Sequence, residues 1–498
     1  MTTDWKINRN LTMLTDFYEL TMSNGYFENG LQDKIAVFDM FFRGIPDRGG
    51  FAIFAGLEQL VEYLAGLHFT QEDIEFLRTK QLFSENFLQY LLDFEFKCDV
   101  WACREGTPIF PNEPIVVVRG PVIQAQLVET MILLTINHQS LIATKANRIV
   151  RAAQGRPVFE FGSRRAQGYD AAILGSRAAY IGGCAATACV LSDRDYQIPA
   201  VGTMAHSWVQ MFNSEYEAFE SYAKLYPNDC TLLVDTYSVV KSGIPNAIKV
   251  FDTVLKPLGC RPKGVRIDSG DIAYLSKKAR RLLDSAGYSD VQIIASNSLD
   301  ENIIRDLLIQ GAQVNSFGVG ESLITSKSEP VFGGVYKLTA IQEGEFYLPK
   351  MKISETLAKI TTPGFKKLYR FYSRETGQAI ADYVTKFDEE VDDNRPIVIF
   401  DPMAIWKKKK VTNYIADSLL VPVFEKGKQV YELPNLRDIQ AYCLAQVDRL
   451  WDEVKRFEHP HTYYVDLSPR LWETKQQLLA EISRFEERGS PSESAEKN

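Results

Sequence analysis

Residues 198–208 read Ile-Pro-Ala-Val-Gly-Thr-Met-Ala-His-Ser-Trp, an apolar run that ends abruptly in glycine, threonine and a single histidine. A buried strand that opens into small and polar residues puts those residues at the edge of a sheet, where α/β proteins place their chemistry. His206 is one of only five histidines in the chain. The competing interpretation is a histidine that merely satisfies its hydrogen bonds in a strand-to-helix turn. The other strand ends of the chain decide between the two.

The same pattern recurs from residue 158 onward: short apolar segments end in Gly, Ser, Asp or Asn, with helical stretches between them. The segments are residues 158–161, 200–201, 231–234, 265–267, 292–295 and 314–317, with residues 335–338 as a candidate seventh member. Strands that alternate with helices pair in parallel, because each crossover connection is long. Six or seven such units favour a closed (β/α) barrel over a small open sheet. The spacing shortens along the series, so we expect an irregular barrel.

The segments on either side of this series have a different character. We expect a helix that opens at Thr15–Met22, a strand over Ile35–Phe42, a helix over Gly50–Leu67 and a helix pair over Ala125–Arg151. The predicted fold class is α/β, an irregular (β/α) barrel with an N-terminal α+β sandwich-like domain completed by C-terminal segments. The predicted division has four parts: an N-terminal α/β domain (1–135), the barrel with the active site (136–345), a C-terminal subdomain packed on the N-terminal domain (346–487) and a disordered tail (488–498).

Composition excludes several classes of protein. The chain of 498 residues is 45% hydrophobic and 24% charged, which is typical of a globular protein. Its formal net charge of −8 argues against nucleic-acid binding, which requires a basic face. The seven cysteines form no closely spaced pair, which favours free thiols in a reducing compartment over disulfides or a zinc site. Because no leader segment or membrane-length apolar run is present in the sequence, we expect a cytoplasmic protein that does not contact membranes.

Parallel strands end at one face of a barrel, so the polar residues that follow them would form a single site. The turns at Ser296-Asn297 and Gly318-Val319-Gly320 can present backbone N–H groups to a phosphate. The carboxylates of Asp235, Asp268 and Asp271 suit Mg²⁺ or sugar hydroxyls, and arginines add fixed positive charge. The expected ligand is a phosphorylated sugar with Mg²⁺. The residues predicted to gather there are Arg164 or Arg165, Thr203, His206, Asp235, Arg266, Asp268, Asp271, Asn297, Gly318 and Gly320.

Five motifs, in this order, resemble those of the nicotinate phosphoribosyltransferase family. They are Thr15–Met22 (TDFYELTM), Phe161–Gly168 (FGSRRAQG), Gly202–Ser207 (GTMAHS), Arg266–Asp271 (RIDSGD) and Gly333–Leu338 (GGVYKL). The resemblance implies an enzyme that joins nicotinate to 5-phosphoribosyl 1-pyrophosphate, giving nicotinate mononucleotide and pyrophosphate, coupled to ATP hydrolysis. That reaction is the entry step from nicotinate to NAD. The implied cofactors are Mg²⁺ and, as a co-substrate, ATP.

The resemblance also implies roles for single residues. Tyr18, expected from the partner subunit of a homodimer, and Phe161 would sandwich the pyridine ring, and Thr203 and Arg266 would contact nicotinate. Arg164, Arg165 and Arg43 would contact the substrate carboxylate or phosphates, with Arg43 again reaching across the dimer interface. Asp235 and Asp268 would bind the ribose hydroxyls and Mg²⁺-pyrophosphate, with Asp271 as a second Mg²⁺ ligand. The 5′-phosphate would be held by Ser296, Asn297, Gly318 and Gly320, and His206 would be phosphorylated by ATP.

One residue departs from the family pattern, in which a threonine often follows the Gly318-Val319-Gly320 turn. This chain has Glu321, whose carboxylate would repel a phosphate, so we expect it to point away from the ligand. Three other interpretations compete: nicotinamide phosphoribosyltransferase, quinolinate phosphoribosyltransferase and a non-catalytic barrel that only binds. The FGSRRAQG and GTMAHS motifs favour the acid substrate over the amide, the quinolinate enzymes are much shorter, and the retained Thr203, His206, Asp235, Arg266 and Asp268 argue against a module without activity.

Overall fold

The computed structural model describes residues 9–354 and 360–489, which divide into two compact units. The central unit comprises Leu141–Pro330 and Leu436–Leu444. The flanking unit comprises Met1–Ser140, Val331–Asn435 and Ala445–Asn498. The chain therefore leaves the flanking unit and returns to it. The tail predicted to be disordered lies outside the described residues from 490 onward.

A parallel six-stranded sheet with the strand order β7-β6-β11-β10-β9-β8 forms the middle of the central unit. The strands are β6 (Val158–Glu160), β7 (Ala186–Thr187), β8 (Thr231–Leu233), β9 (Gly264–Ile267), β10 (Gln292–Ala295) and β11 (Ser316–Val319). Register is set by short parallel ladders in which Ile294 of β10 faces Arg266 of β9 on one side and Ser316 of β11 on the other. In the described part of the chain no ladder joins β7 to β8, so the sheet is a curled, open half-barrel rather than the closed barrel expected from the sequence.

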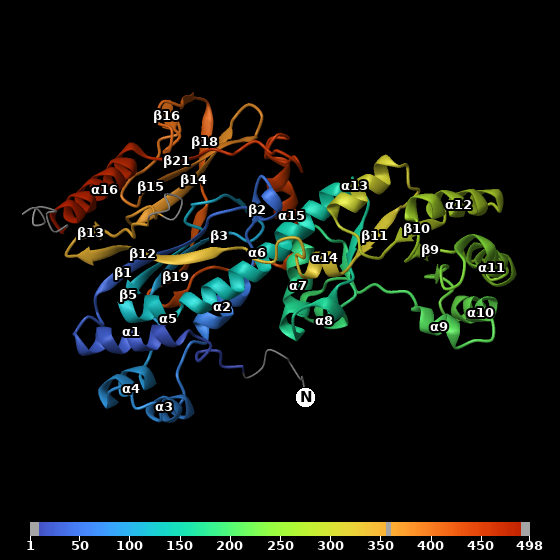
Figure 1. Ribbon diagram of the computed structural model, residues 1–498, viewed down its shortest axis with the longest axis horizontal. Coiled ribbons are helices and arrows are strands. Elements are labelled where there is room, and N and C mark those ends of the chain that lie inside the picture. The colour runs from blue at the N-terminus through green and yellow to red at the C-terminus, as the bar shows by residue number, and fades with distance from the viewer. Residues whose placement is uncertain (1–8, 355–359, 490–498) are drawn as a thin grey trace, which may run out of the picture. The chain divides into compact units, whose positions relative to one another are not determined.

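Helices connect these strands, and their apolar sides bury the sheet (Figure 1). Val265 of β9 and Ile293 of β10 are fully buried against Ala279 and Leu283, which lie on one side of α12 (Ile272–Ser285). The other helical segments are α7 (Tyr169–Ile181), α8 (Val190–Tyr196), α9 (His206–Gln210), α10 (Glu215–Leu225), η3 (Val239–Gly243), α11 (Ile244–Val250), η4 (Phe251–Leu255), α13 (Glu301–Ile309), α14 (Glu321–Ile324) and the short η2 (Ser163–Arg165). α6 (Glu129–Ala152) and α15 (Leu436–Asp448) each contribute residues to both units.

Two predicted members of the strand series are wrong. Ala200–Val201 forms no strand: Ala200 makes a single bridge to Thr187, and the preceding Pro199 has no N–H with which to extend the ladder. Residues 335–338 belong instead to an antiparallel strand of the flanking unit, β12 (Gly334–Glu343). The strands predicted near residues 158, 231, 265 and 292 are confirmed, and β11 extends two residues further than predicted, through Gly318 and Val319.

The described residues of the flanking unit form two larger sheets and two two-stranded sheets. An antiparallel seven-stranded sheet has the order β13-β12-β1-β5-β3-β19-β20, and a four-stranded sheet has the order β18-β14-β15-β21. Strand β1 covers Ile35–Phe42, as predicted. The other strands are β2 (Ala52–Ile53), β3 (Asp99–Cys103), β4 (Pro108–Ile109), β5 (Val116–Pro121), β13 (Phe346–Pro349), β14 (Lys366–Ser373), β15 (Ala379–Lys386), β16 (Ile397–Phe400), β17 (Lys408–Val411), β18 (Tyr414–Ser418), β19 (Leu420–Glu425), β20 (Lys428–Gln429) and β21 (Val465–Leu467).

Helices of the flanking unit lie largely where the sequence predicts them. The helix expected over Gly50–Leu67 is shorter, because Gly56 adopts a left-handed φ of 106° and α2 (Leu57–Ala65) begins only after it. The remaining helices are α1 (Phe17–Glu28), η1 (Pro46–Arg48), α3 (Gln71–Arg78), α4 (Glu85–Leu92), α5 (Val122–Leu127) and α16 (Pro469–Gly489). All seven cysteines are free thiols, as predicted. Over residues 9–354 and 360–489, no helix combines the length and the apolar character needed to cross a membrane.

A buried ion pair joins the two larger sheets of the flanking unit. Lys366 Nζ of β14 lies 2.6 Å from Asp39 Oδ2 of β1, and neither side chain is more than 3% exposed. The ammonium also donates to the carbonyl oxygens of Thr362 and Gly364. Burial raises the pKa of Asp39 and lowers the pKa of Lys366, with the opposite charge of each partner working against burial. Each charge depends on its partner, because an unpaired buried charge is strongly unfavourable.

We expect Lys366→Met to lower the free energy of unfolding by ~3–5 kcal/mol, because it leaves the Asp39 carboxylate buried without its cation. The double variant Asp39→Asn, Lys366→Met should recover part of that loss. Denaturant unfolding followed by circular dichroism measures both. The matched control is Lys367→Met, whose partner Glu390 is 81% exposed, and a loss of under ~1 kcal/mol is expected there. Equal losses for the two single variants would contradict the assigned role of the buried pair.

Candidate active site

The side chain of Asp235 links the carboxyl ends of β8 and β9 through hydrogen bonds. One carboxylate oxygen, Oδ2, accepts a hydrogen bond from the backbone N–H of Asp268 at 2.9 Å and another from the Ser269 hydroxyl at 2.6 Å. The bond from Asp268 continues the β8–β9 ladder, in which Leu233 pairs with Arg266. Asp235 therefore holds the first residues after β9 in position relative to the end of β8.

Asp268 extends this connection to β10 and to His206. The Ser296 hydroxyl, just after β10, donates to Asp268 Oδ1, and Asp268 Oδ2 lies 3.8 Å from His206 Nε2. The other ring nitrogen of His206, Nδ1, lies 3.2 Å from the Thr236 hydroxyl. His206 is the first residue of α9, and its side chain is 40% exposed. The imidazole is thus held between a hydroxyl and a carboxylate with one face open to solvent.

Three buried polar atoms at these strand ends have no hydrogen-bond partner among the described residues. They are Ser163 Oγ after β6, Asp235 Oδ1 after β8 and Arg266 Nε on β9. The Arg266 guanidinium makes one hydrogen bond, from Nη2 to the carbonyl oxygen of Met204 at 3.1 Å. Burial lowers the pKa of Arg266, and the nearby Asp268 and Asp235 oppose that shift. Buried donors and acceptors left unpaired in a folded protein indicate a place where a polar ligand binds.

Gly318 and Gly320 lie against Phe161 at the end of β6. A Cβ atom on Gly318 would come within 2.4 Å of the Phe161 ring, and one on Gly320 would come within 3.1 Å of the Phe161 carbonyl oxygen. The Phe161 N–H donates to the carbonyl oxygen of Val319 at 2.8 Å, which holds the two chains at this separation. Glycine at position 318 is therefore required by the ring beside it. Ser296 and Asn297 also follow a strand, and Asn297 has a left-handed φ of 94°, a conformation that concentrates at binding sites.

Comparison with known proteins agrees with this geometry. Models of the N-terminal domain, the family as a whole and the C-terminal domain of nicotinate phosphoribosyltransferase match residues 13–137, 157–347 and 365–475. A nicotinate phosphoribosyltransferase of Bacillus subtilis is 43% identical over 480 residues, covering 96% of this chain and 97% of the relative. The chain belongs to the nicotinate phosphoribosyltransferase family.

Solved structures extend the comparison to the fold. The crystal structure of human nicotinic acid phosphoribosyltransferase covers 94% of this chain and 100% of its own, with a TM-score of 0.82 and 29% sequence identity. A nicotinate-nucleotide pyrophosphorylase from Pyrococcus furiosus matches with a TM-score of 0.68 over 90% of this chain. At 23% identity the second match indicates a shared fold only.

Glu321, the residue that departs from the family pattern, makes two ion pairs. Its carboxylate lies 2.6 Å from Lys327 Nζ and 3.9 Å from Arg165 Nε. Lys327 is the main reason that the pKa of Glu321 is lowered. The carboxylate is therefore neutralised by two cations, one of which, Arg165, is predicted to contact substrate. Arg164 lies on the short helix η2 together with Arg165, and its positive charge contributes to the lowered pKa of Arg266.

Other predicted residues are placed differently. Asp271 Oδ1 accepts from the N–H of Tyr274 at 2.9 Å and caps α12. Thr203 is partly buried, and its hydroxyl lies 3.4 Å from the carbonyl oxygen of Met204, the same oxygen that accepts a hydrogen bond from Arg266. In the described part of the chain, no group of three or more His, Cys, Asp or Glu side chains could hold a metal ion. Thr236 and Ser269 are not among the residues predicted from the sequence, although each directly follows a predicted site aspartate.

Two predicted residues lie in the flanking unit. Tyr18 on α1 is 44% exposed, and burial of part of the side chain, followed by the charge of Glu129, raises the pKa of its hydroxyl. Arg43 follows β1, and its guanidinium lies 5.6 Å from the centre of the Phe41 ring. Arg43 Nε is buried and makes no hydrogen bond with any described residue. Tyr18 thus exposes part of its side chain, and Arg43 has a donor without a partner among the described residues.

We expect Gly318→Ala to lower the free energy of unfolding by ~1–3 kcal/mol, because the added methyl group overlaps the Phe161 ring. Denaturant unfolding monitored by circular dichroism measures the change. Gly202→Ala is the matched control, since a Cβ at Gly202 would meet no atom within 4 Å. A Gly318→Ala protein as stable as the control would show that the close approach is not a constraint.

Proposed function

We propose that this protein is a nicotinate phosphoribosyltransferase that joins nicotinate to 5-phosphoribosyl 1-pyrophosphate and hydrolyses ATP in the process. Membership of the family supports the reaction. The observation that carries the proposal is the pair of unpaired buried atoms at adjacent strand ends, Arg266 Nε and Asp235 Oδ1. One is a cationic donor and the other an anionic acceptor, so together they fit a ligand with an anionic group and hydroxyl groups.

In this proposal the anionic group beside Arg266 is the nicotinate carboxylate. A carboxylate accepts charge-assisted hydrogen bonds from a guanidinium, and it would stabilise the charged form of Arg266, which burial disfavours. Thr203 borders the same position, and the Phe161 ring, held by Gly318, would cover one face of the pyridine ring. Tyr18 of the partner subunit would cover the other face. A neutral amide would gain less from Arg266, which favours nicotinate over nicotinamide.

The phosphoribosyl group would occupy the ends of β8, β10 and β11. Asp235 Oδ1 would accept from a ribose hydroxyl, and the turn at Ser296-Asn297 with Gly318 and Gly320 would hold the 5′-phosphate. Arg164, Arg165 and the partner subunit's Arg43 would lie near phosphate or carboxylate groups. A homodimer with a shared site is supported by the exposed apolar side chains of α1, Phe17, Tyr18 and Met22. The cytoplasmic location and the four-part domain division stay predictions.

The donor set also fits a magnesium ion. Mg²⁺ is usually held by one or two carboxylates plus substrate phosphates and water, and Asp268 with the neighbouring Asp235 supplies two carboxylates. Asp271 is the weaker candidate, because one of its oxygens caps α12. When bound, the ion would neutralise charge on the pyrophosphate leaving group.

The reaction itself requires positioning more than proton transfer. The pyridine nitrogen attacks C1 of the ribose while the bond from C1 to the pyrophosphate oxygen breaks, and pyrophosphate leaves with the bonding electrons. The nucleophile carries no proton, so no general base is needed. The side chains around Asp235 would hold the sugar in the orientation needed for attack. The arginines would stabilise the negative charge of the leaving group.

His206 is the proposed acceptor of the phosphoryl group from ATP. The contact of Nδ1 with Thr236 leaves Nε2 as the acceptor atom. Phosphorylation there would add about two negative charges within 3.8 Å of the Asp268 carboxylate. The repulsion would move Asp268 and, through Ser296 and Asp235, the residues proposed to hold the sugar phosphate. That chain of contacts would couple ATP hydrolysis to substrate binding.

The test of the proposed function is product formation from nicotinate or nicotinamide, with 5-phosphoribosyl 1-pyrophosphate, in the presence and absence of ATP. Nicotinate mononucleotide should form and ATP should increase its yield. Arg266→Gln should lower kcat/KM for nicotinate by about 100-fold, the cost of one buried charged hydrogen bond. Preference for nicotinamide, or binding of the sugar phosphate without turnover, would support one of the competing functions instead.

His206→Ala should abolish the increase produced by ATP and leave slow transfer without ATP, because the imidazole takes the phosphoryl group and not a proton. Radiolabel from [γ-³²P]ATP should appear on the wild-type protein and not on the variant. Thr236→Val, which removes the hydroxyl beside Nδ1, should retain the label at a reduced rate. Undiminished ATP coupling in His206→Ala would rule out this role.

A further inference from the structure

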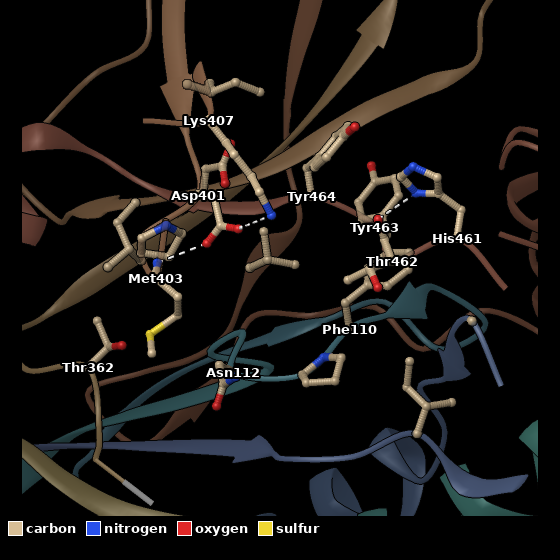
Figure 2. Close-up of a pocket in the computed structure, with 18 of the residues that line it drawn as sticks. Phe110, Asn112, Thr362, Asp401, Met403, Lys407, His461, Thr462, Tyr463 and Tyr464 are labelled. Carbon is tan, nitrogen blue, oxygen red and sulfur yellow. Dashed lines mark hydrogen bonds and ion pairs between the residues drawn. The ribbon is translucent and has the colours of Figure 1, made fainter. Parts of the chain in front are cut away.

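A cavity of about 1810 Å³ lies within the flanking unit and contains none of the proposed catalytic residues (Figure 2). Its walls come from the loop after β1, the turn after β4, the β16–β17 hairpin, the loop that leads into β21 and the start of α16. Figure 2 shows Asp401, Met403 and Lys407 across the cavity from His461 and Tyr464. Pockets for drug-sized ligands have volumes of roughly 300–1,000 Å³, so this one can hold a ligand larger than a single ring.

Cationic side chains outnumber carboxylates in the lining. The cations are Arg48, Lys407, Lys408, Lys409 and Lys475, and the carboxylates are Asp401, Glu458 and Asp466. Lys407 pairs with Asp401 at 3.8 Å. Burial, followed by the charge of Asp401, raises the pKa of Asp466 to about 6, while Lys409 opposes the shift. Within residues 9–354 and 360–489, no carboxylate lies within ion-pairing distance of Arg48, Lys408 or Lys475.

Lys475 is the most informative of these cations. It is partly buried, and its ammonium makes one hydrogen bond, to the Thr362 hydroxyl at 3.4 Å. Burial, followed by the charge of Lys366, lowers its pKa. A cation in such a place is costly unless an anion joins it. Lys475 therefore indicates the part of the cavity where an anionic group would bind.

Aromatic rings form much of the remaining wall. Phe110 and Tyr463 stack with their centres 3.9 Å apart and an angle of 11° between their planes, and both are buried. Tyr464 is 38% exposed at the cavity, with Phe457 and Trp472 partly buried nearby. Of the rings named here, Tyr464 has an exposed surface on which a flat ring can stack, and Lys409, whose Nζ lies 5.5 Å from the centre of that ring, adds attraction for a phosphate.

We propose that this cavity binds a phosphorylated aromatic ligand of the nucleotide class, with its phosphate at Lys475 and its base against the Tyr464 wall. Several unpaired cations together with the volume favour a ligand with a base and phosphates over inorganic phosphate alone. The net charge of −8 disfavours a nucleic-acid strand. Binding at this cavity does not depend on the proposed catalytic reaction.

One loop joins the cavity to Arg43. Ile45 and Arg48 line the cavity, and Arg43, which in the proposed function contacts substrate bound to the partner subunit, precedes them in the same loop. Asp47 and Arg48 have left-handed φ angles of 55° and 50°, which are strained for residues other than glycine. A ligand that contacts Arg48 would change the balance of conformations of this loop, so occupancy would alter turnover.

The test is photolabelling of the full-length protein with 8-azidoadenosine 5′-triphosphate, followed by peptide mapping. Peptides from residues 451–479 or 397–411 should carry label, and excess unlabelled ATP should remove it. Lys475→Gln should reduce that label by about tenfold or more, the loss expected for one charge-assisted contact. Lys475→Arg, which keeps the cation, should retain it. Label confined to residues 158–330 would identify the ATP site of the proposed function alone and overturn this inference.

Lys428→Gln is the matched control, since Lys428 is exposed and lies outside the cavity. It should leave labelling of both regions unchanged. Lys475→Gln should keep the wild-type melting temperature or raise it, because it removes a partly buried charge that lacks a counter-ion. If its labelling of the cavity peptides equals that of Lys428→Gln, the cavity does not bind nucleotides through Lys475.

Discussion

The carboxylate of Asp235 is the constraint on which the candidate active site depends. By accepting from the Asp268 N–H and the Ser269 hydroxyl, it fixes the first residues after β9 relative to the end of β8. Asp268 is then bonded to Ser296 and lies near His206, so three strand ends and one helix start are connected through two side chains. The second oxygen of Asp235 stays unpaired because the first oxygen makes both of these bonds. One residue thereby organises the site and leaves an acceptor for a ligand.

Much of this arrangement could be predicted because the strands of the central unit are short and buried and end in polar residues. The apolar segments correctly predict β8, β9 and β10, and the polar residues after them include the aspartates that follow β8 and β9. The prediction is wrong at Ala200–Val201, where the apolar run resembles a strand but Pro199 has no N–H with which to extend the ladder. It failed at residues 335–338 because strand character alone does not reveal which sheet a strand joins. Periodicity carries no information about long-range pairing.

Residue roles were harder to predict than strands. Asp271 has the side chain of a magnesium ligand, yet the geometry uses one of its oxygens to cap a helix. The carboxylate of Glu321 would repel a phosphate, and its pairing with Lys327 and Arg165 explains how the chain accommodates it. Thr236 and Ser269 were missed because a hydroxyl next to an aspartate has no distinct sequence signal. Such contacts become visible only when the strand ends are placed side by side.

The contact between Gly318 and Phe161 also limits how this protein can change over evolutionary time. Because the two positions share one volume, a larger residue at 318 is accommodated only if the residue at 161 becomes smaller or moves. The sizes of these two residues are therefore expected to vary together among relatives, although Phe161 follows β6, Gly318 lies on β11 and the two are far apart in sequence. An enzyme engineered for a bulkier ring would have to change both positions at once, since either change alone leaves an overlap or a void.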